Sequence, residues 1–388
     1  MSTCVPGLSR FPEAQRAVLA QFAADNPRLA DLALTFPLLF FLLATTAPGP
    51  RRRDDLIRLV VQGRQLSEVA KVAGVPLCLR RLPPEACEHP LDWVDWSAGT
   101  GRYLGNQIPA DPVAAANWLA AVYSAARICE ESFALWVGRC LIRSPALFLS
   151  ASNGTPQLDL LAPLAIHAWH SQHAESDLRW MAFTPWSPRM GLETAIVEAR
   201  YFLNRLKLYA HFGRRPIADS WIERGTAGNF AFVPLLSFWD VMEERIDMRN
   251  CLDCYADKLA RNESRLFGVR LKGRKVATLE LAPERRAERR PVIVQLKGPG
   301  NADVPVDIWH AAFAWLAEAP RKPVPVADER SLGHADLELR TMLQPYFAAT
   351  GLAPVSERYR MFAGFAALDR AIVALAAKAG VGGWPFRQ

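Results

Sequence analysis

The chain has 388 residues, of which 51% are hydrophobic and 22% are charged. This composition excludes disordered, collagen-like and low-complexity proteins. The length predicts two or three domains and is sufficient to bury a large core without help from disulfides or metal ions. The formal net charge is +7, and the seven cysteines are scattered rather than arranged as in a small secreted domain. We therefore expect a reducing compartment and a cytoplasmic protein, since no secretory signal is recognisable.

One apolar segment resembles a membrane span. Residues 32–47 carry no charge, and three arginines follow at 51–53. The segment has sixteen residues, fewer than the roughly 20 that a membrane-spanning helix requires, and Pro37 interrupts it. We expect a buried helix and no membrane span, although the flanking arginines also suit a membrane segment.

Most of the remaining chain predicts helix. Aliphatic and aromatic residues recur every three or four positions over 114–142, which predicts one long amphipathic helix or two. The same period runs through 191–212. A proline-rich stretch at 320–328 predicts an exposed linker, and helix resumes after it.

A helix-turn-helix pattern is visible in residues 66–76, where Ala70 is followed four residues later by Gly74. The segment 77–81 would then be the recognition helix that places two arginines against DNA. Because Pro83 keeps that helix very short, a packed helical turn is the alternative, and we favour it.

Strands are predicted between residues 264 and 297. Two alternating segments, 265–271 and 275–281, flank the turn residues 272–274, and 291–297 forms a third. The predicted fold class is therefore α+β, predominantly helical, with one small antiparallel sheet of about three strands packed on helices.

This pattern divides the chain into three parts. We predict a helical N-terminal region over 1–220 and an α+β core over 221–319. A linker and a C-terminal helical segment follow over 320–388.

The strand region is strongly basic. Residues 262–300 contain ten basic and four acidic side chains, a local charge of +6. Such a field attracts phosphate or an acidic partner, so nucleic acid and an acidic protein are the predicted partners. The alternative is a solvated hairpin whose arginines serve solubility only. The candidate binding cations are Arg270, Lys272, Arg274, Lys275 and Lys297.

A candidate catalytic site surrounds Cys251. A thiol at a helix N-terminus has a lowered pKa and is a better nucleophile, and Tyr255 shares its face of the predicted helix. Because side chains alternate along a strand, Thr278 and Glu280 lie on the same side of their strand. Gln295 lies on that face of the sheet as well if the strands pair in register. Cys251 is then the candidate nucleophile, Glu280 and Gln295 orient the substrate, and His310 is the nearest downstream base. The alternative is a buried structural thiol beside a hydrogen-bonded Glu/Gln pair.

The same cysteines could instead belong to a metal site. Cys251 and Cys254 form one Cys-x-x-Cys pair, but the second pair that a zinc site needs is missing. Three further ligands, His167, His170 and His173, lie close together and would have to complete it. We expect them to be surface or loop histidines, and we predict neither a metal nor a cofactor.

Residues from about 235 to 315 are similar to the PcfJ-like family of bacterial, plasmid and phage proteins. The motif residues that carry this similarity are Glu244, 248–251, Tyr255, 276–280, 295–299 and Asn301. The resemblance implies that Cys251, Tyr255, Glu280, Gln295 and Asn301 belong to one site, and Asn250 stands where many members have His. It implies no chemistry, since the family's activity is unassigned.

Three interpretations of function remain. The first is an interaction or nucleic-acid-associated protein of bacterial mobile elements that uses the basic sheet region, with Asn250, Tyr255 and Asn301 in an adjoining polar site. The second is a cysteine-dependent hydrolase or transferase. The third is a scaffold in which the polar site is purely structural.

Overall fold

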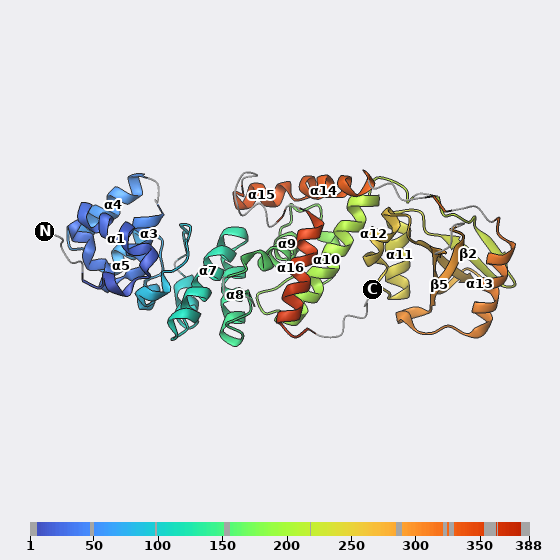
Figure 1. Cartoon of the computed structure of the whole chain (residues 1–388), viewed down its shortest axis with the longest axis horizontal. Coiled ribbons are helices and arrows are strands. Elements are labelled where there is room, and N and C mark those ends of the chain that lie inside the picture. The colour runs from blue at the N-terminus through green and yellow to red at the C-terminus, as the bar shows by residue number, and fades with distance from the viewer. Residues whose placement is uncertain are drawn as a thin grey trace. The chain divides into compact units, whose positions relative to one another are not determined.

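The computed structural model of the chain describes residues 6–46, 50–97, 99–150, 156–217, 219–284, 289–320, 324–325, 330–352, 362 and 364–381. About 60% of the structure is helical, and the described residues contain sixteen α-helices and one five-stranded antiparallel sheet (Figure 1). The predicted α+β class with a small antiparallel sheet is therefore confirmed.

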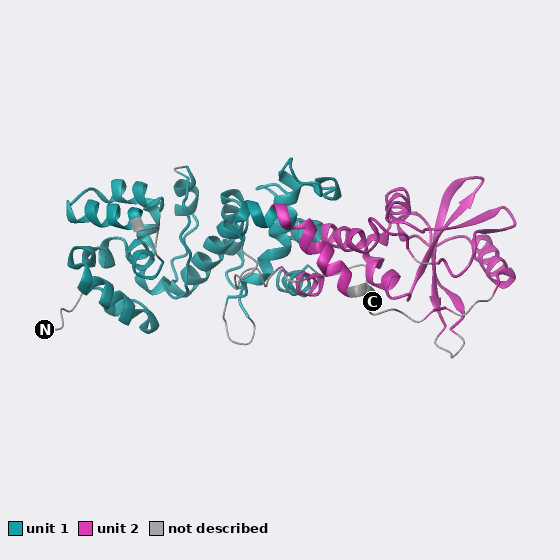
Figure 2. Cartoon of the chain, turned by 90° about the horizontal axis from the view of Figure 1, so that it is seen from above, with its two compact units in different colours: residues 1–199, 346–361, 370–388 teal, residues 200–345, 362–369 magenta. Residues whose placement is uncertain are grey.

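The chain divides into two compact units (Figure 2). Unit 1 comprises residues 1–199, 346–361 and 370–388, and unit 2 comprises 200–345 and 362–369. Three helices, α10 (Leu192–Phe212), α15 (Gln344–Thr350) and α16 (Phe365–Lys378), contribute residues to both units.

Unit 1 is built from helices. Its α-helices before α10 are α1 (Glu13–Asp25), α2 (Leu32–Thr35), α3 (Pro37–Thr45), α4 (Pro50–Val61), α5 (Leu66–Ala73), α6 (Thr100–Gly105), α7 (Pro112–Ile128), α8 (Glu131–Arg143) and α9 (Ala162–Gln172). Helix α15 (Gln344–Thr350) contributes its last residues to this unit. The segment predicted over 114–142 is thus two helices, and Asp111 caps the first by accepting a hydrogen bond from the Ala114 N–H at 2.7 Å.

The apolar segment forms two short helices, of which α2 is half-buried and α3 is buried. The break lies at Phe36, because Pro37 begins α3. Residues 38–43 of α3 are at most 1% exposed, which confirms the predicted buried helix. Within the described residues, no helix has the length and hydrophobicity to span a membrane.

The helix-turn-helix pattern does not fold as a DNA-reading motif. Helix α5 ends at Gly74, whose φ of 65° closes the turn. The following segment, Leu77–Arg81, is a 3-10 helix of five residues with Leu79 fully buried. It is a packed turn, as favoured from the sequence, rather than a recognition helix.

Unit 2 contains the sheet. Its strands are β1 (Gly225–Ala227), β2 (Phe230–Pro234), β3 (Arg265–Leu271), β4 (Arg274–Pro283) and β5 (Pro291–Lys297), paired antiparallel in chain order. Its helices include α11 (Phe238–Met248), α12 (Ala256–Ala260), α13 (Val306–Glu318) and α14 (Arg330–Met342). The three predicted strands are confirmed, and the β1–β2 hairpin adds two more.

Turns and bulges set the register of the sheet. Lys272 and Gly273 join β3 to β4 with φ values of 49° and 81°, the geometry of a two-residue type I′ turn. Between β4 and β5 the register shifts after Glu280, so Val294 has no partner on β4 and is 51% exposed. This bulge and the N-terminal Pro291 interrupt strand β5.

Helices cover both faces of the sheet, α11 and α12 on one side and α13 on the other (Figure 1). On the α13 side, Ala277, Leu279 and Leu281 of β4 join an apolar core in which Trp315 stacks on Phe232 with ring centroids 4.6 Å apart. The intervening residues of β4 therefore point to the α11 side, where the candidate site lies.

Candidate functional site

Helix α11 directs the chain onto the sheet. Ser237 caps its N-terminus by accepting a hydrogen bond from the Asp240 N–H at 3.1 Å. The helix ends at Arg249, which adopts a left-handed conformation with φ 51° and turns the chain back toward the sheet. Asn250 and Cys251 follow, and the short 3-10 helix Leu252–Tyr255 leads into α12.

Tyr255 is the centre of a first cluster of hydrogen-bonded side chains, the Tyr255 cluster (Tyr255, Lys258, Ser264, Glu280 and Gln295). Its hydroxyl donates to Glu280 Oε2 at 2.7 Å and lies 3.1 Å from Gln295 Oε1. Ser264 Oγ donates to Glu280 Oε1 at 2.9 Å, and Lys258 Nζ lies 3.5 Å from the same oxygen. Both oxygens of this buried carboxylate are therefore satisfied.

The sheet register explains why these groups meet. Glu280 and Gln295 are direct partners across β4 and β5, so they share a face as the sequence predicted. Burial, and next the negative charge of Glu280, raise the pKa of Tyr255 above its ordinary value. The phenol accordingly keeps its proton and acts as a donor to the carboxylate.

A second cluster is centred on Glu244, the Glu244 cluster (Glu244, Asn250, Arg270, Lys275 and Thr278). Glu244 is 0% exposed and pairs with Arg270, whose Nη2 lies 2.7 Å from Oε2. Thr278 Oγ1 donates to Glu244 Oε1 at 3.0 Å, and Asn250 Nδ2 donates to Thr278 Oγ1 at 3.1 Å. This chain of bonds ties the end of α11 to β3 and β4.

Glycine makes room for the ion pair. The Arg270 guanidinium lies over Gly268, two residues earlier on β3, where a Cβ atom would collide with it. Any larger residue at position 268 would displace the arginine from Glu244.

Cys251 follows Asn250 of the Glu244 cluster but does not lie in the predicted position at the start of an α-helix. It is half-buried and precedes a 3-10 helix of only four residues, rather than lying in the first turn of an α-helix. Its thiol contacts that of Cys254, and this hydrogen bond, followed by burial, raises the pKa of Cys254. In the described part of the chain, no side-chain bond joins Cys251 to a histidine or a carboxylate.

His310, the predicted base, is not brought to the site. It is exposed on α13, which packs on the opposite face of the sheet from α11 and Cys251. Asn301 has a left-handed conformation with φ 62° in the turn after β5, and no side-chain bond links it to Tyr255 or Glu280. Of the predicted site, the structure thus assembles Tyr255, Glu280 and Gln295 directly, with Asn250 joined through Thr278.

Most of the candidate cations are paired. Arg270 is bound to Glu244, Lys297 Nζ lies 2.6 Å from Asp303 Oδ1, and Lys275 contacts Glu243 Oε1 at 2.8 Å and also Asp247. Lys272 and Arg274 are exposed at the β3–β4 turn, and neither side chain forms an ion pair with any described residue. The neighbouring Arg285 and Arg286 lie outside the described residues.

Two of the three histidines, His167 and His170, lie in α9, and His173 follows the helix as its C-cap residue. His167 and His170 are buried, contrary to the expected surface or loop position, because α9 is buried along most of its length. His170 Nδ1 lies 2.7 Å from Ser176 Oγ, and burial lowers the pKa of His170 to about 3. Among the described residues, no group of three His, Cys, Asp or Glu side chains is arranged to hold a metal ion.

Sequence reasoning left three polar residues out of the site: Glu244, Lys258 and Ser264. A signal existed for Glu244. It follows Val241 and precedes Met248 at helical spacing, so a carboxylate occupies a position of α11 that is otherwise apolar and buried. Such a position predicts a buried cation partner, although its identity depends on long-range pairing.

Comparison with known proteins gives no further support for this site. The chain matches no protein-family model, no curated protein and no solved structure. The resemblance to the PcfJ-like family stays a prediction from the motif residues between Glu244 and Asn301.

Proposed function

We propose that this chain is a nucleic-acid-associated interaction protein of PcfJ-like type and that unit 2 contacts phosphate through the β3–β4 turn. The observation that carries the proposal is the exposure of Lys272 and Arg274, which have no carboxylate partner among the described residues. Their charges are available to an external anion, whereas those of Arg270, Lys275 and Lys297 are balanced within the protein.

The shape of the turn favours such a contact. Lys272 lies in the two-residue turn, beyond the last pair of the ladder, and Arg274 belongs to that last pair with Leu271, so both cations lie at the tip of the hairpin. Neutralising phosphates releases counterions, so two cations at one tip make binding depend on salt.

The polar clusters support a structural rather than a catalytic role. The Glu280 carboxylate is engaged by Tyr255, Ser264 and Lys258, and that of Glu244 by Arg270 and Thr278. Neither carboxylate is free to take a proton from a substrate. The cysteine-dependent enzyme would need a base that the described residues do not supply to Cys251.

The test is binding of fluorescein-labelled DNA, single- and double-stranded, followed by anisotropy over a range of salt concentrations. We expect affinity to fall steeply with salt in the wild type. The double variant Lys272→Glu/Arg274→Glu should bind at least about tenfold more weakly at low salt, with the log–log salt slope reduced by about two. The matched control, Arg127→Glu/Arg179→Glu, changes two exposed arginines of unit 1 and should bind like the wild type.

Two results would contradict the proposal. One is unchanged DNA binding by the Lys272→Glu/Arg274→Glu variant. The other is binding of polyglutamate but not of DNA, which would point to an acidic protein. Alkylation of Cys251 near neutral pH that is much faster than that of the half-buried Cys129 would support the cysteine-dependent enzyme instead.

A further inference from the structure

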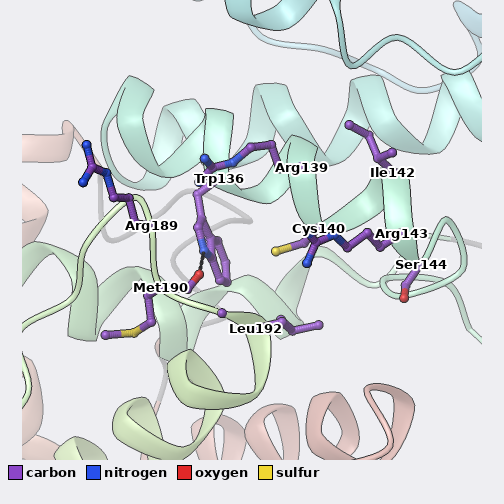
Figure 3. A pocket seen from close by; sticks show the side chains of 10 residues that line it. Trp136, Arg139, Cys140, Ile142, Arg143, Ser144, Arg189, Met190 and Leu192 are labelled. Carbon is purple, nitrogen blue, oxygen red and sulfur yellow. Dashed lines mark hydrogen bonds between the residues drawn. The ribbon is translucent and has the colours of Figure 1, made fainter.

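Unit 1 contains a cavity that the proposed function does not use. Its volume is about 520 Å³, within the size range of small-molecule sites. Figure 3 shows side chains of α8 along one side of it and Met190 and Leu192 on the other. The two walls are far apart in sequence, so the fold brings them together.

The cavity is preformed. Trp136 of α8 is buried, stacks on Phe133 with ring centroids 5.8 Å apart, and meets Trp186 edge-on. Its Nε1 donates to the carbonyl oxygen of Met190 at 2.7 Å, which fixes the second wall to the first (Figure 3). A ligand would therefore not have to order this segment before binding.

Three guanidinium groups and no carboxylate line the cavity. Arg139 and Arg143 are four residues apart on one face of α8, and Arg189 belongs to the opposite wall. Arg139 donates to the carbonyl oxygen of Pro188, and none of the three forms an ion pair with a described residue. An arginine in the last turn of a helix compensates the helix dipole, which can explain Arg143 but neither Arg139 nor Arg189.

The remaining lining is apolar or neutral. Met190, Leu192 and Ile142 contribute hydrophobic surface, and Cys140 points into the space between the walls. Burial raises the pKa of Cys140 to about 12, against the opposing effect of Arg139 and Arg143. The thiol is thus uncharged, and the positive charge of the arginines is not balanced from within.

We infer that this cavity binds a small organic anion, with its oxyanion headgroup attracted by the positive charge of Arg139, Arg143 and Arg189 and its apolar part against Met190 and Leu192. Guanidinium groups bind phosphate and carboxylate through paired hydrogen bonds. The hydrophobic wall favours an anion with an apolar group over inorganic phosphate, which has none. The site is independent of the β3–β4 turn, which belongs to unit 2.

The test is calorimetric titration of the full chain with phenyl phosphate, benzoate, inorganic phosphate and benzyl alcohol. We expect saturable binding of an aromatic anion, weaker binding of inorganic phosphate and none of benzyl alcohol. The stronger of phenyl phosphate and benzoate identifies the headgroup. Arg189→Ala and Arg143→Ala should each weaken binding about tenfold, as expected for loss of a charge-assisted hydrogen bond.

The controls separate this site from the rest of the protein. Arg102→Ala removes an arginine elsewhere in unit 1 and should bind like the wild type, as should Lys272→Glu/Arg274→Glu. Bound phenyl phosphate should slow alkylation of Cys140 but not of Cys254, which lies outside the cavity. Wild-type affinity in both Arg189→Ala and Arg143→Ala, or equal binding of benzyl alcohol, would overturn the inference.

Discussion

The two faces of the sheet in unit 2 pack on their helices through different kinds of interaction. Toward α13 the contact is apolar, with Phe267, Leu279 and Trp315 in one core. Toward α11 and α12, hydrogen-bonded charges alternate with apolar side chains, and Glu244 and Glu280 are buried there. Because both faces draw on alternate residues of β4, the same strand shows what each kind of contact contributes.

The comparison teaches that burial has different consequences on the two sides. An apolar side chain is stabilised wherever it is removed from water. A buried carboxylate is tolerated only if its partners are in place, which restricts how α11 can sit on the sheet. The apolar face supplies stability, and the polar face supplies a specific arrangement.

The largest effect is expected on the apolar face. Phe267→Ala should lower the free energy of unfolding by about 3–5 kcal/mol, because it leaves a cavity beside Trp315. Urea denaturation measures this change. Phe313→Ala, on the exposed side of α13, is the control and should cost less than about 1 kcal/mol.

Breaking the buried ion pair comes next. Glu244→Leu leaves Arg270 without its carboxylate and should cost about 3 kcal/mol. The double variant Glu244→Leu/Arg270→Met removes both charges and should recover most of that loss. A double variant as unstable as Glu244→Leu alone would mean that the cost arises from packing rather than charge.

A smaller effect is expected in the Tyr255 cluster. Tyr255→Phe removes the donor to Glu280 while Ser264 and Lys258 remain, so we expect a loss of about 1–2 kcal/mol. Tyr103→Phe, on an exposed tyrosine, should leave stability unchanged. Equal stability of Tyr255→Phe and wild type would show that the hydroxyl contributes nothing to the polar face.

The smallest effect concerns pH. A hydrogen bond with His211 and then the charge of Lys207 lower the pKa of Asp257, on α12, to about 2. This carboxyl therefore stabilises the folded state above its unfolded pKa of about 3.9, and that contribution is lost as the pH falls toward about 2.

The carboxylate is 44% exposed, so solvent screening should keep its contribution below about 1 kcal/mol. Asp257→Asn should show a correspondingly flatter loss of stability on acidification, measured by urea denaturation. The loss in free energy of unfolding caused by Phe267→Ala should stay constant over the same pH range. If the free energy of unfolding of Asp257→Asn and of the wild type fell in parallel on acidification, the stabilising role of the Asp257 carboxylate would be contradicted.

Local rules predicted much of this architecture. Alternation in β4 placed Thr278 and Glu280 on one side, and the apolar period predicted α7, α8 and α10. The β1–β2 hairpin was missed, because a three-residue strand such as Gly225–Ala227 has too little alternation to be recognised. It forms because β2 pairs with β3 along its whole length.

The site was harder to predict than the fold. Tyr255, Glu280 and Gln295 met because strand register and face determine their positions. Cys251 and His310 were linked by sequence order alone, and order does not tell on which face of a sheet the next helix packs. Charge counting also failed to separate Lys272 from Lys275, since the carboxylates of α11 that bind Lys275 are distant in sequence.

The interrupted strand β5 has a consequence for association between molecules. Within the described residues it pairs only with β4, so its outer backbone groups border no other strand. Pro291 lacks an N–H, and the bulge at Val294 breaks the even spacing that an added strand would need. This margin is therefore a poor template for the addition of further strands in cross-β growth.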